Sequence, residues 1–296
     1  MVEEAWVKLV NFRNGASRGL GVLDEGRHAV RRIEYAGRPA EELLPLLEDW
    51  DPEAVRAVGD PVALSAVELL APIPRPARNV FCVGKNYHDH SAEFASSGYD
   101  ATDRGAAVPK LPIFFTKPST TVIGPGVEID PHRELTSSLD YEVELTVVIG
   151  RGGRGIPRER AMEHVWGYTL INDVTARDLQ RDHAQWFLGK SLDTFCPMGP
   201  WVVTADELDG ADVIVETLVN GELRQHANLR DLIFDIPTLI STLSAGMTLE
   251  PGDLLATGTP AGVGLGFDPP RFLQPGDEVC VRATGLGELR NRIAAA

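Results

Sequence analysis

Cysteine is scarce in this sequence of 296 residues, with only Cys82, Cys196 and Cys280, and no two of them form a C-x-x-C pair. A small, odd and scattered set argues against a disulfide framework and against a cysteine zinc site. The chain also lacks a basic segment followed by an apolar run near its start, and no stretch reaches the roughly 18 apolar residues that span a bilayer. We therefore expect a soluble, cytoplasmic protein that folds without disulfides.

Positive charge is also in short supply. The chain has 28 Lys and Arg residues against 43 Asp and Glu residues, for a net charge of −15. Such a charge repels phosphate backbones and anionic lipids, so the sequence predicts neither nucleic-acid nor membrane partners. If the substrate is itself an anion, a metal ion or a lysine must supply positive charge locally.

The order of apolar runs and turn residues predicts a small domain followed by a large one. Strand-like and helix-like runs alternate over the first seventy residues, with residues 6–10 strand-like and residues 41–44 and those from 62 onward helix-like. We expect a small α/β module there. Residues 71–76 include three prolines, which is typical of a connector. We therefore divide the chain into domains 1–73 and 74–296.

The second domain is predicted to be mostly β with some α (α+β). Short apolar runs are separated by turn dipeptides, and Asn220-Gly221 is a hairpin signal. One amphipathic helix should follow Asp235, because apolar residues then recur at helical spacing and Asp235 can cap the first turn.

Two glutamates interrupt an otherwise apolar, β-branched segment at residues 141–149. In a strand, Glu142 and Glu144 lie on the same face because side chains alternate with period two. That face could simply be in water. However, it continues to Val148, which suggests burial, and two adjacent buried carboxylates cannot both stay ionised without a cation. A hard divalent cation, which prefers oxygen ligands, is the simplest way to compensate the two negative charges.

Asp173 ends a second apolar segment, residues 166–173, and is a candidate third ligand. Taken alone it could equally cap a turn or a helix. His90 and Glu93 stand three residues apart after the strand-like residues 79–83, a spacing that lets a carboxylate orient an imidazole as a general base. Pairs of this kind also occur on surfaces, and His88 and His90 could be mistaken for zinc ligands.

Two loops could bind an anion. Lys190 lies in a turn-rich segment, residues 189–200, and Thr259 in a loop of glycines and threonines, residues 257–264, whose amides could bind carboxylate oxygens. A lone lysine can equally be solvated. The second loop lacks the lysine of a phosphate-binding loop.

Taken in order, these segments resemble the fumarylacetoacetate hydrolase family, especially its short bacterial and acylpyruvase-like members. The resemblance spans about residues 78 to 293. It is carried by the motifs V-G-K-N-Y-x-x-H-x-x-E (83–93), F-x-K-P-S-T (115–120), D-Y-E-V-E-L (140–145), N-D-V-T-A-R-D (172–178), G-K-S-L-D-T-F and T-G-T-P-A-G-V-G. The order and number of these motifs make the resemblance specific.

The resemblance implies a role for each matched residue. Glu142, Glu144 and Asp173 would bind the metal, which could be Mg²⁺, Mn²⁺ or Ca²⁺. A His90/Glu93 dyad and Lys190 would be catalytic, and the weaker candidates Arg177, Gln180 and Thr259 would bind substrate. The implied fold is a mixed β-sandwich roll, usually in a homodimer. Residues around 90 to 108, with Gly98 and Gly105, would form a lid. Longer relatives add an aspartate ligand and pair the histidine with a remote glutamate, whereas this chain has H-x-x-E.

The activity first implied is hydrolysis of a C–C bond in an acylpyruvate, giving pyruvate and an acid. In this reaction the His90/Glu93 dyad would activate water and Lys190 would add positive charge near a small anionic keto acid. The same site could decarboxylate oxaloacetate or tautomerise an unsaturated keto acid, because function resides in the pocket rather than the fold. An alternative of another class is a non-catalytic metal- or ligand-binding protein.

Overall fold

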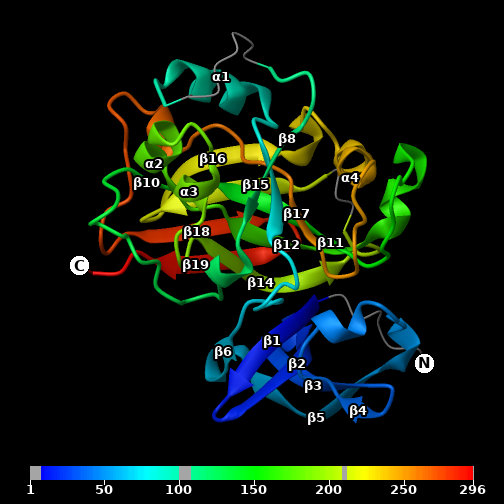
Figure 1. Ribbon diagram of the computed structural model, residues 1–296. Helices are drawn as coiled ribbons and strands as arrows, with labels where there is room; N and C mark the ends of the chain where they lie inside the picture. Colours follow the sequence, from blue (N-terminus) through cyan, green and yellow to red (C-terminus); the bar gives the residue numbers. More distant parts are fainter. Residues whose placement is uncertain (1–7, 100–107, 209–211, 296) are drawn as a thin grey trace.

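The computed structural model describes residues 8–99, 108–208 and 212–295, which form a β-rich molecule with a smaller N-terminal part beside a larger C-terminal part (Figure 1). The strands fall into a 13-stranded mixed sheet, a four-stranded sheet and a two-stranded ribbon. The predicted class, mostly β with some α, is confirmed.

The N-terminal part is built from strands and short 3₁₀ turns. Its strands are β1 (Lys8–Asn14), β2 (Ser17–Asp24), β3 (Ala29–Tyr35), β4 (Arg38–Pro39), β5 (Val55–Ala63) and β6 (Glu68–Leu69). The prediction of α-helices in this module was wrong for the described residues 8–73. Residues 62 and 63 end β5, which pairs with β3, and residues 44–46 form a 3₁₀ turn. Short apolar runs do not distinguish a strand from a helix, and here strand pairing decides.

The C-terminal part has thirteen strands within the described residues. They are β7 (Val80–Gly84), β8 (Ile113–Lys117), β9 (Val122–Ile123), β10 (Leu139–Asp140), β11 (Val143–Ile149), β12 (Val165–Asn172), β13 (Thr175–Ala176), β14 (Cys196–Thr204), β15 (Ile214–Val219), β16 (Glu222–Asn228), β17 (Leu254–Ala256), β18 (Glu278–Ala283) and β19 (Gly287–Arg292). The hairpin predicted at Asn220-Gly221 is confirmed, because both residues have positive φ between β15 and β16.

Four α-helices occur in the described residues, namely α1 (His88–Ser96), α2 (Arg177–Asp182), α3 (Phe187–Lys190) and α4 (Ile236–Ser244). The predicted helix after Asp235 is α4, and the Asp235 side chain accepts a hydrogen bond from the Thr238 amide as its N-cap. The proposed lid falls on α1 and the residues after it. Gly98 lies just past the helix, whereas Gly105 lies outside the described residues.

The two faces of β11 pack against different parts of the protein. Val143, Leu145 and Val147 belong to a core that includes residues of the four-stranded sheet β16-β15-β18-β19. On the opposite face, Val148 packs in a second core with N-terminal residues such as Leu9. Every residue of β11 is buried. The face that carries Glu144 is therefore interior, as Val148 suggested.

The N-terminal part joins the rest through the shared core around Val148 and through one short strand pairing. Lys8 and Leu9 of β1 pair with Val203 and Val202 of β14, which makes the 13-stranded sheet continuous across both parts. We keep the division at residue 73 as a proposal based on the proline-rich connector.

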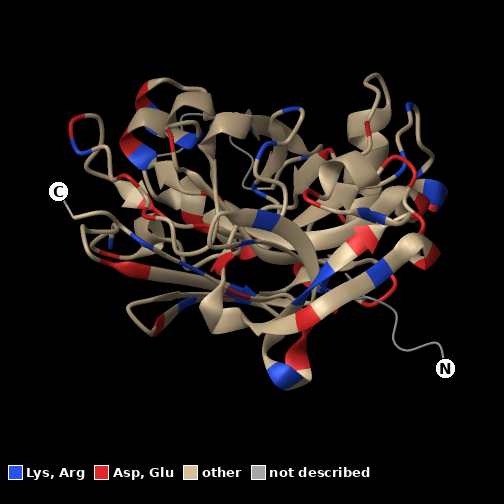
Figure 2. Ribbon diagram, turned by 90° about the horizontal axis from the view of Figure 1, so that it is seen from below, with Lys and Arg blue, Asp and Glu red and all other residues tan. Residues whose placement is uncertain are grey.

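All three cysteines are free and buried. None of the helices in the described ranges is long and apolar enough to cross a membrane. In the view of Figure 2, the ribbon segments coloured for basic and for acidic residues are interspersed. That the protein binds neither nucleic acid nor membranes stays a prediction.

Candidate active site

Antiparallel pairing of β11 with β12 brings Glu142, Glu144 and Asp173 together. Val143 lies opposite Asn172, and the ladder continues one step further because the Asp173 amide donates to the Glu142 carbonyl over 2.8 Å. Glu142 and Asp173 are therefore cross-strand neighbours, and Glu144 lies two residues along on the face of Glu142. Glu142 stands one residue before β11 begins, slightly outside the strand that was predicted to contain it.

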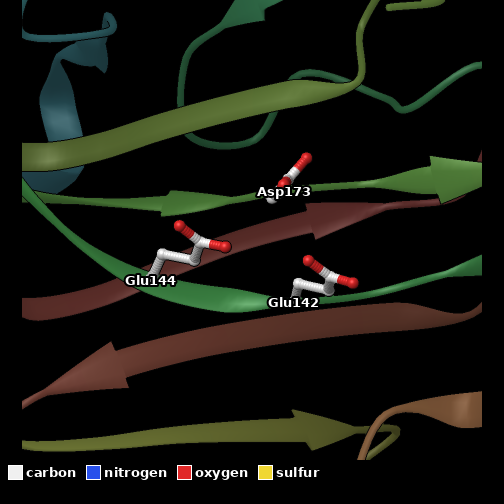
Figure 3. A group of neighbouring side chains, drawn as sticks. All are labelled: Glu142, Glu144 and Asp173. Carbon is white, nitrogen blue, oxygen red and sulfur yellow. The ribbon is translucent and has the colours of Figure 1, made fainter. Parts of the chain in front are cut away.

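The three carboxylates form a compact, buried group. One ligand oxygen from each lies within 4.8 Å of the others, and Figure 3 shows Glu142 and Glu144 on one chain segment with Asp173 on the segment beside it. The exposed fractions are 4%, 1% and 0%. A set of three carboxylates without nitrogen or sulfur ligands suits a hard cation such as Mg²⁺, Mn²⁺ or Ca²⁺. The structure thus brings together the three residues predicted to bind metal.

Cationic side chains surround two of these carboxylates. Lys190 Nζ lies 2.7 Å from Glu142 Oε2 and 2.8 Å from Asp173 Oδ2. Arg177 Nη1 lies 2.7 Å from Glu142 Oε1, and its Nε donates to Asp140 Oδ2 over 2.8 Å. Burial alone would raise the pKa of Glu142, but Lys190 and Arg177 lower it to about 2.

Lys117 completes the support of Asp173. This lysine ends β8, is fully buried, and donates to Asp173 Oδ1 over 2.6 Å. It also donates to the carbonyls of Val174 and Lys190. Lys117 therefore positions one carboxylate of the candidate metal site and the backbone of Lys190 at the same time.

Glu144 differs from its two neighbours because, in the described residues, its hydrogen bond comes from a backbone amide. Gly258 N donates to Glu144 Oε2 over 2.9 Å. Gly258 has φ +101°, and a Cβ there would lie 2.8 Å from Asn86 Cβ, so both conformation and space require glycine. Burial, followed by the nearby charges of Asp173 and Glu142, raises the pKa of Glu144 well above its ordinary value.

The charge balance of the cluster fits a divalent cation. Asp140, Glu142, Glu144 and Asp173 face three cationic side chains, those of Lys117, Arg177 and Lys190. With all groups ionised, one negative charge remains in a buried site, where an uncompensated charge is costly. A divalent ion at the carboxylates would make the cluster positive by one charge, which favours an anionic substrate despite the acidic surface.

His90 and Glu93 form the predicted pair on α1. His90 Nδ1 lies 3.2 Å from Glu93 Oε2, and the histidine is 5% exposed. Glu93 also accepts hydrogen bonds from the Gly262 amide at 3.1 and 3.3 Å. The carboxylate is thus held on both sides. Among the described residues, His90 Nε2 makes no hydrogen bond, which leaves this atom for a ligand in the pocket.

A pocket connects these groups. His90, Glu142, Glu144 and Lys190 line it, together with the predicted substrate contacts Arg177, Gln180 and Thr259 and with Val83, Gly84, Lys85, Phe94, Phe115 and Trp186. Gln180 accepts a hydrogen bond from Arg177 Nη1 over 3.2 Å, and Thr259 accepts one from Gln225 Nε2 over 2.8 Å. The structure therefore brings all nine predicted site residues to one place.

Several residues of the site were not singled out from the sequence. Lys117 was visible as a lysine within the F-x-K-P-S-T motif, and Asp140 as the acid that opens D-Y-E-V-E-L. Asp140 accepts hydrogen bonds from Arg177, Gly264 and Leu265 and so links the glycine loop to the arginine that contacts Glu142. The signal was a charged residue next to an apolar strand segment, which Lys117 ends and Asp140 precedes.

Comparison with known proteins agrees with this geometry. The family model described as Fumarylacetoacetate (FAA) hydrolase C-terminal matches residues 79–294. The chain is 48% identical over 267 residues to the oxaloacetate tautomerase YisK of Bacillus subtilis, covering 90% of this chain and 81% of the relative.

Solved structures with the same fold include a fumarylacetoacetate hydrolase from Exiguobacterium antarcticum, with 42% identity and a TM-score of 0.80 over 98% of this chain and 100% of that one. They also include a 5-carboxymethyl-2-hydroxymuconate delta-isomerase from Mycobacterium smegmatis, with 35% identity and a TM-score of 0.76 over 98% and 100% of the two chains. The chain belongs to the fumarylacetoacetate hydrolase family.

Proposed function

We propose that this protein is a divalent-metal-dependent tautomerase that interconverts the enol and keto forms of a 2-keto dicarboxylic acid such as oxaloacetate. The observation that carries the proposal is the His90–Glu93 pair, which lines the same buried pocket as the carboxylates Glu142 and Glu144. This reaction requires an acid–base group beside a centre that binds the anion and stabilises the enolate. The names of the tautomerase and isomerase relatives support it.

Glu142, Glu144 and Asp173 would hold Mg²⁺ or Mn²⁺, which when bound would polarise the keto acid and stabilise negative charge on its oxygen. Lys190 supplies a further positive charge beside Glu142 and Asp173. Phe115 and Trp186 form an apolar wall of the pocket, which limits water and strengthens these electrostatic interactions.

His90 would carry out the proton transfer. Glu93 orients the ring through Nδ1, so Nε2 is the nitrogen that meets the substrate. In ketonisation, Nε2 takes the proton of the enol hydroxyl and delivers a proton to C3. The C2=C3 electron pair forms the new C3–H bond, and the oxygen electrons form the C2=O bond. The reverse sequence gives the enol, so no co-reactant is required.

Acylpyruvate hydrolysis, the activity first expected, remains a second candidate. The same His90–Glu93 pair could activate a water molecule, and Gly262 holds Glu93 in a position that serves either role. Oxaloacetate decarboxylation needs the metal and Lys190 but no attacking water, so it is a third candidate. A non-catalytic role as a metal- or ligand-binding protein is the alternative of another class.

One set of assays separates these candidates. With Mg²⁺ or Mn²⁺, the protein should accelerate the decay of the ultraviolet absorbance of enol-oxaloacetate, and a chelator should abolish this effect. Pyruvate release from oxaloacetate would instead indicate decarboxylation, and loss of diketone absorbance from an acylpyruvate would indicate hydrolysis. If none of these reactions depends on metal and protein, the tautomerase proposal is wrong and a binding role is favoured.

We further propose that the protein works in the cytoplasm as a homodimer. Three buried free thiols suit a reducing compartment. The homodimer follows from the family resemblance.

A further inference from the structure

An aromatic wall of the pocket has a lysine ammonium near each end. Trp186 makes edge contacts with Phe94 and Phe115, with ring centroids 6.1 and 5.5 Å apart. Lys190 Nζ lies 5.2 Å from the Phe115 ring centre, and Lys85 Nζ lies 5.3 Å from that of Phe94. Lys190 marks the metal end of the wall because it contacts Glu142 and Asp173. Lys85 therefore marks an end that none of the roles assigned so far uses.

Lys85 has an unusual conformation for a lysine. Its φ is +56°, in the left-handed region that residues other than glycine rarely adopt, and it is only 6% exposed although it carries a charge. Strained backbone of this kind occurs preferentially where function requires a side chain in a particular place. The strain and the burial both act to keep the Lys85 ammonium at the pocket.

Trp186 adds a hydrogen-bond donor to the same wall. Its indole Nε1 is buried and has no hydrogen-bond acceptor among the described residues. The six-membered ring of the indole packs on the backbone before Lys85, where a Cβ at Gly84 would lie 1.9 Å from Trp186 Cζ3, and Nε1 is on the other side of the indole. A buried donor that lacks an acceptor destabilises the free protein. A ligand that places an acceptor atom there would therefore bind more tightly.

We propose that Lys85 and the Trp186 indole N–H bind the substrate carboxylate remote from the metal, so that the site selects 2-keto dicarboxylates over 2-keto monocarboxylates. This inference rests on the proposed function and specifies its substrate class. The 2-keto acid end faces Lys190 and the carboxylate triad, the carbon chain crosses the face of the aromatic wall, and the second carboxylate meets Lys85. A lysine that only packed on Phe94 would give no such preference.

Ligand binding tests the proposal without relying on catalysis. Malate and 2-hydroxybutyrate carry the same 2-hydroxy acid group, and differ in having a carboxylate or a methyl group at the far end. Titration calorimetry of the full chain loaded with Mg²⁺ would compare them for the natural protein, Lys85→Asn, Lys85→Arg and Trp186→Phe. Asparagine is among the residues that tolerate positive φ, so Lys85→Asn removes the charge without adding strain.

Malate should bind the natural protein at least about tenfold more tightly than 2-hydroxybutyrate. Lys85→Asn should weaken malate binding by roughly 10- to 100-fold, the range for loss of a charged hydrogen bond. It should change 2-hydroxybutyrate binding by less than about threefold. Lys85→Arg should restore most of the preference, and Trp186→Phe should reduce it by about threefold to tenfold.

Equal binding of the two ligands to the natural protein would overturn the proposal, as would an equal loss of both ligands in Lys85→Asn. If Lys85→Asn does not fold, Trp186→Phe decides. An unchanged preference of this variant for malate over 2-hydroxybutyrate would contradict the role of the Trp186 N–H. Failure of the tautomerase assay together with a normal malate preference would overturn the proposed function and leave this ligand specificity standing.

Discussion

Lys117 Nζ lies 2.6 Å from Asp173 Oδ1, and neither side chain is accessible to solvent. Removing one partner of a buried ion pair leaves the other charge uncompensated and costs about 3–5 kcal/mol. We therefore expect Lys117→Met to lower the free energy of unfolding of the metal-free protein by about that amount. Urea denaturation measures it, with the exposed lysine variant Lys110→Met as the matched control. A loss no larger than that of the control would contradict the positioning role of Lys117.

Glu144 and Glu142 should respond in opposite ways to the same substitution. In Glu144→Gln the repulsion by Asp173 and Glu142 disappears, so the metal-free protein should keep its melting temperature or gain a few degrees. Glu142→Gln should lower it, because Lys190 and Arg177 lose their partner. Both variants should bind Mn²⁺ at least about 100-fold more weakly, since each lacks a charged metal ligand. Calorimetry and thermal denaturation check both quantities, and undiminished Mn²⁺ affinity in both would contradict the metal site.

His90→Ala should reduce metal-dependent turnover of enol-oxaloacetate by about 10²- to 10⁴-fold, the usual contribution of a general acid–base group. Glu93→Gln should have a smaller effect in the same direction, because it weakens the orientation of the ring without removing it. Mn²⁺ affinity is the control and should stay within about twofold in both variants. Turnover by His90→Ala at the natural rate would show that another group transfers the proton.

Asp235 caps α4, and Asp235→Ala should lower the free energy of unfolding by about 1 kcal/mol at pH 7. Asp235→Asn should lose much less, because asparagine also caps helices. Burial alone would raise the pKa of Asp235, but hydrogen bonds from Thr238 and the charge of Arg158 lower it. The stabilisation that depends on its charge is therefore complete above the unfolded pKa of about 4 and is lost as the pH falls through the lower folded pKa. Urea denaturation from pH 7 to pH 3 should show the difference between the natural protein and Asp235→Ala shrinking, and a difference that grows would contradict this assignment.

Local sequence patterns were sufficient for features that depend on neighbouring residues. Period-two alternation placed Glu142 and Glu144 on one face, Asp235 marked the start of α4, and Asn220-Gly221 marked a hairpin. The spacing of His90 and Glu93 already implied their contact. Each of these features involves residues a few positions apart, where backbone geometry alone sets which side chains meet.

The family resemblance extended these patterns to residues that are far apart in the chain. It joined Asp173 and Lys190 to the glutamates and identified Thr259 as part of the same site. The pairing of β11 with β12 and with β17 brings Asp173 and the loop of Thr259 to the glutamates, and Lys190 reaches them from the end of α3.

Tertiary structure alone decided the rest. Lys117 meets a carboxylate 56 positions away, and Asp140 meets amides 124 and 125 positions away. The periodicity of neighbouring residues in the sequence does not indicate such contacts. Within residues 8–70, the run that ends at residue 63 forms a strand rather than a helix because β5 pairs with β3, a choice that short apolar runs leave open. The sequence by itself thus determined the family and the residues able to bind a metal. Only long-range packing determined which charges balance one another and where Lys85 and Trp186 lie in the pocket, because burial and pairing depend on contacts between distant segments.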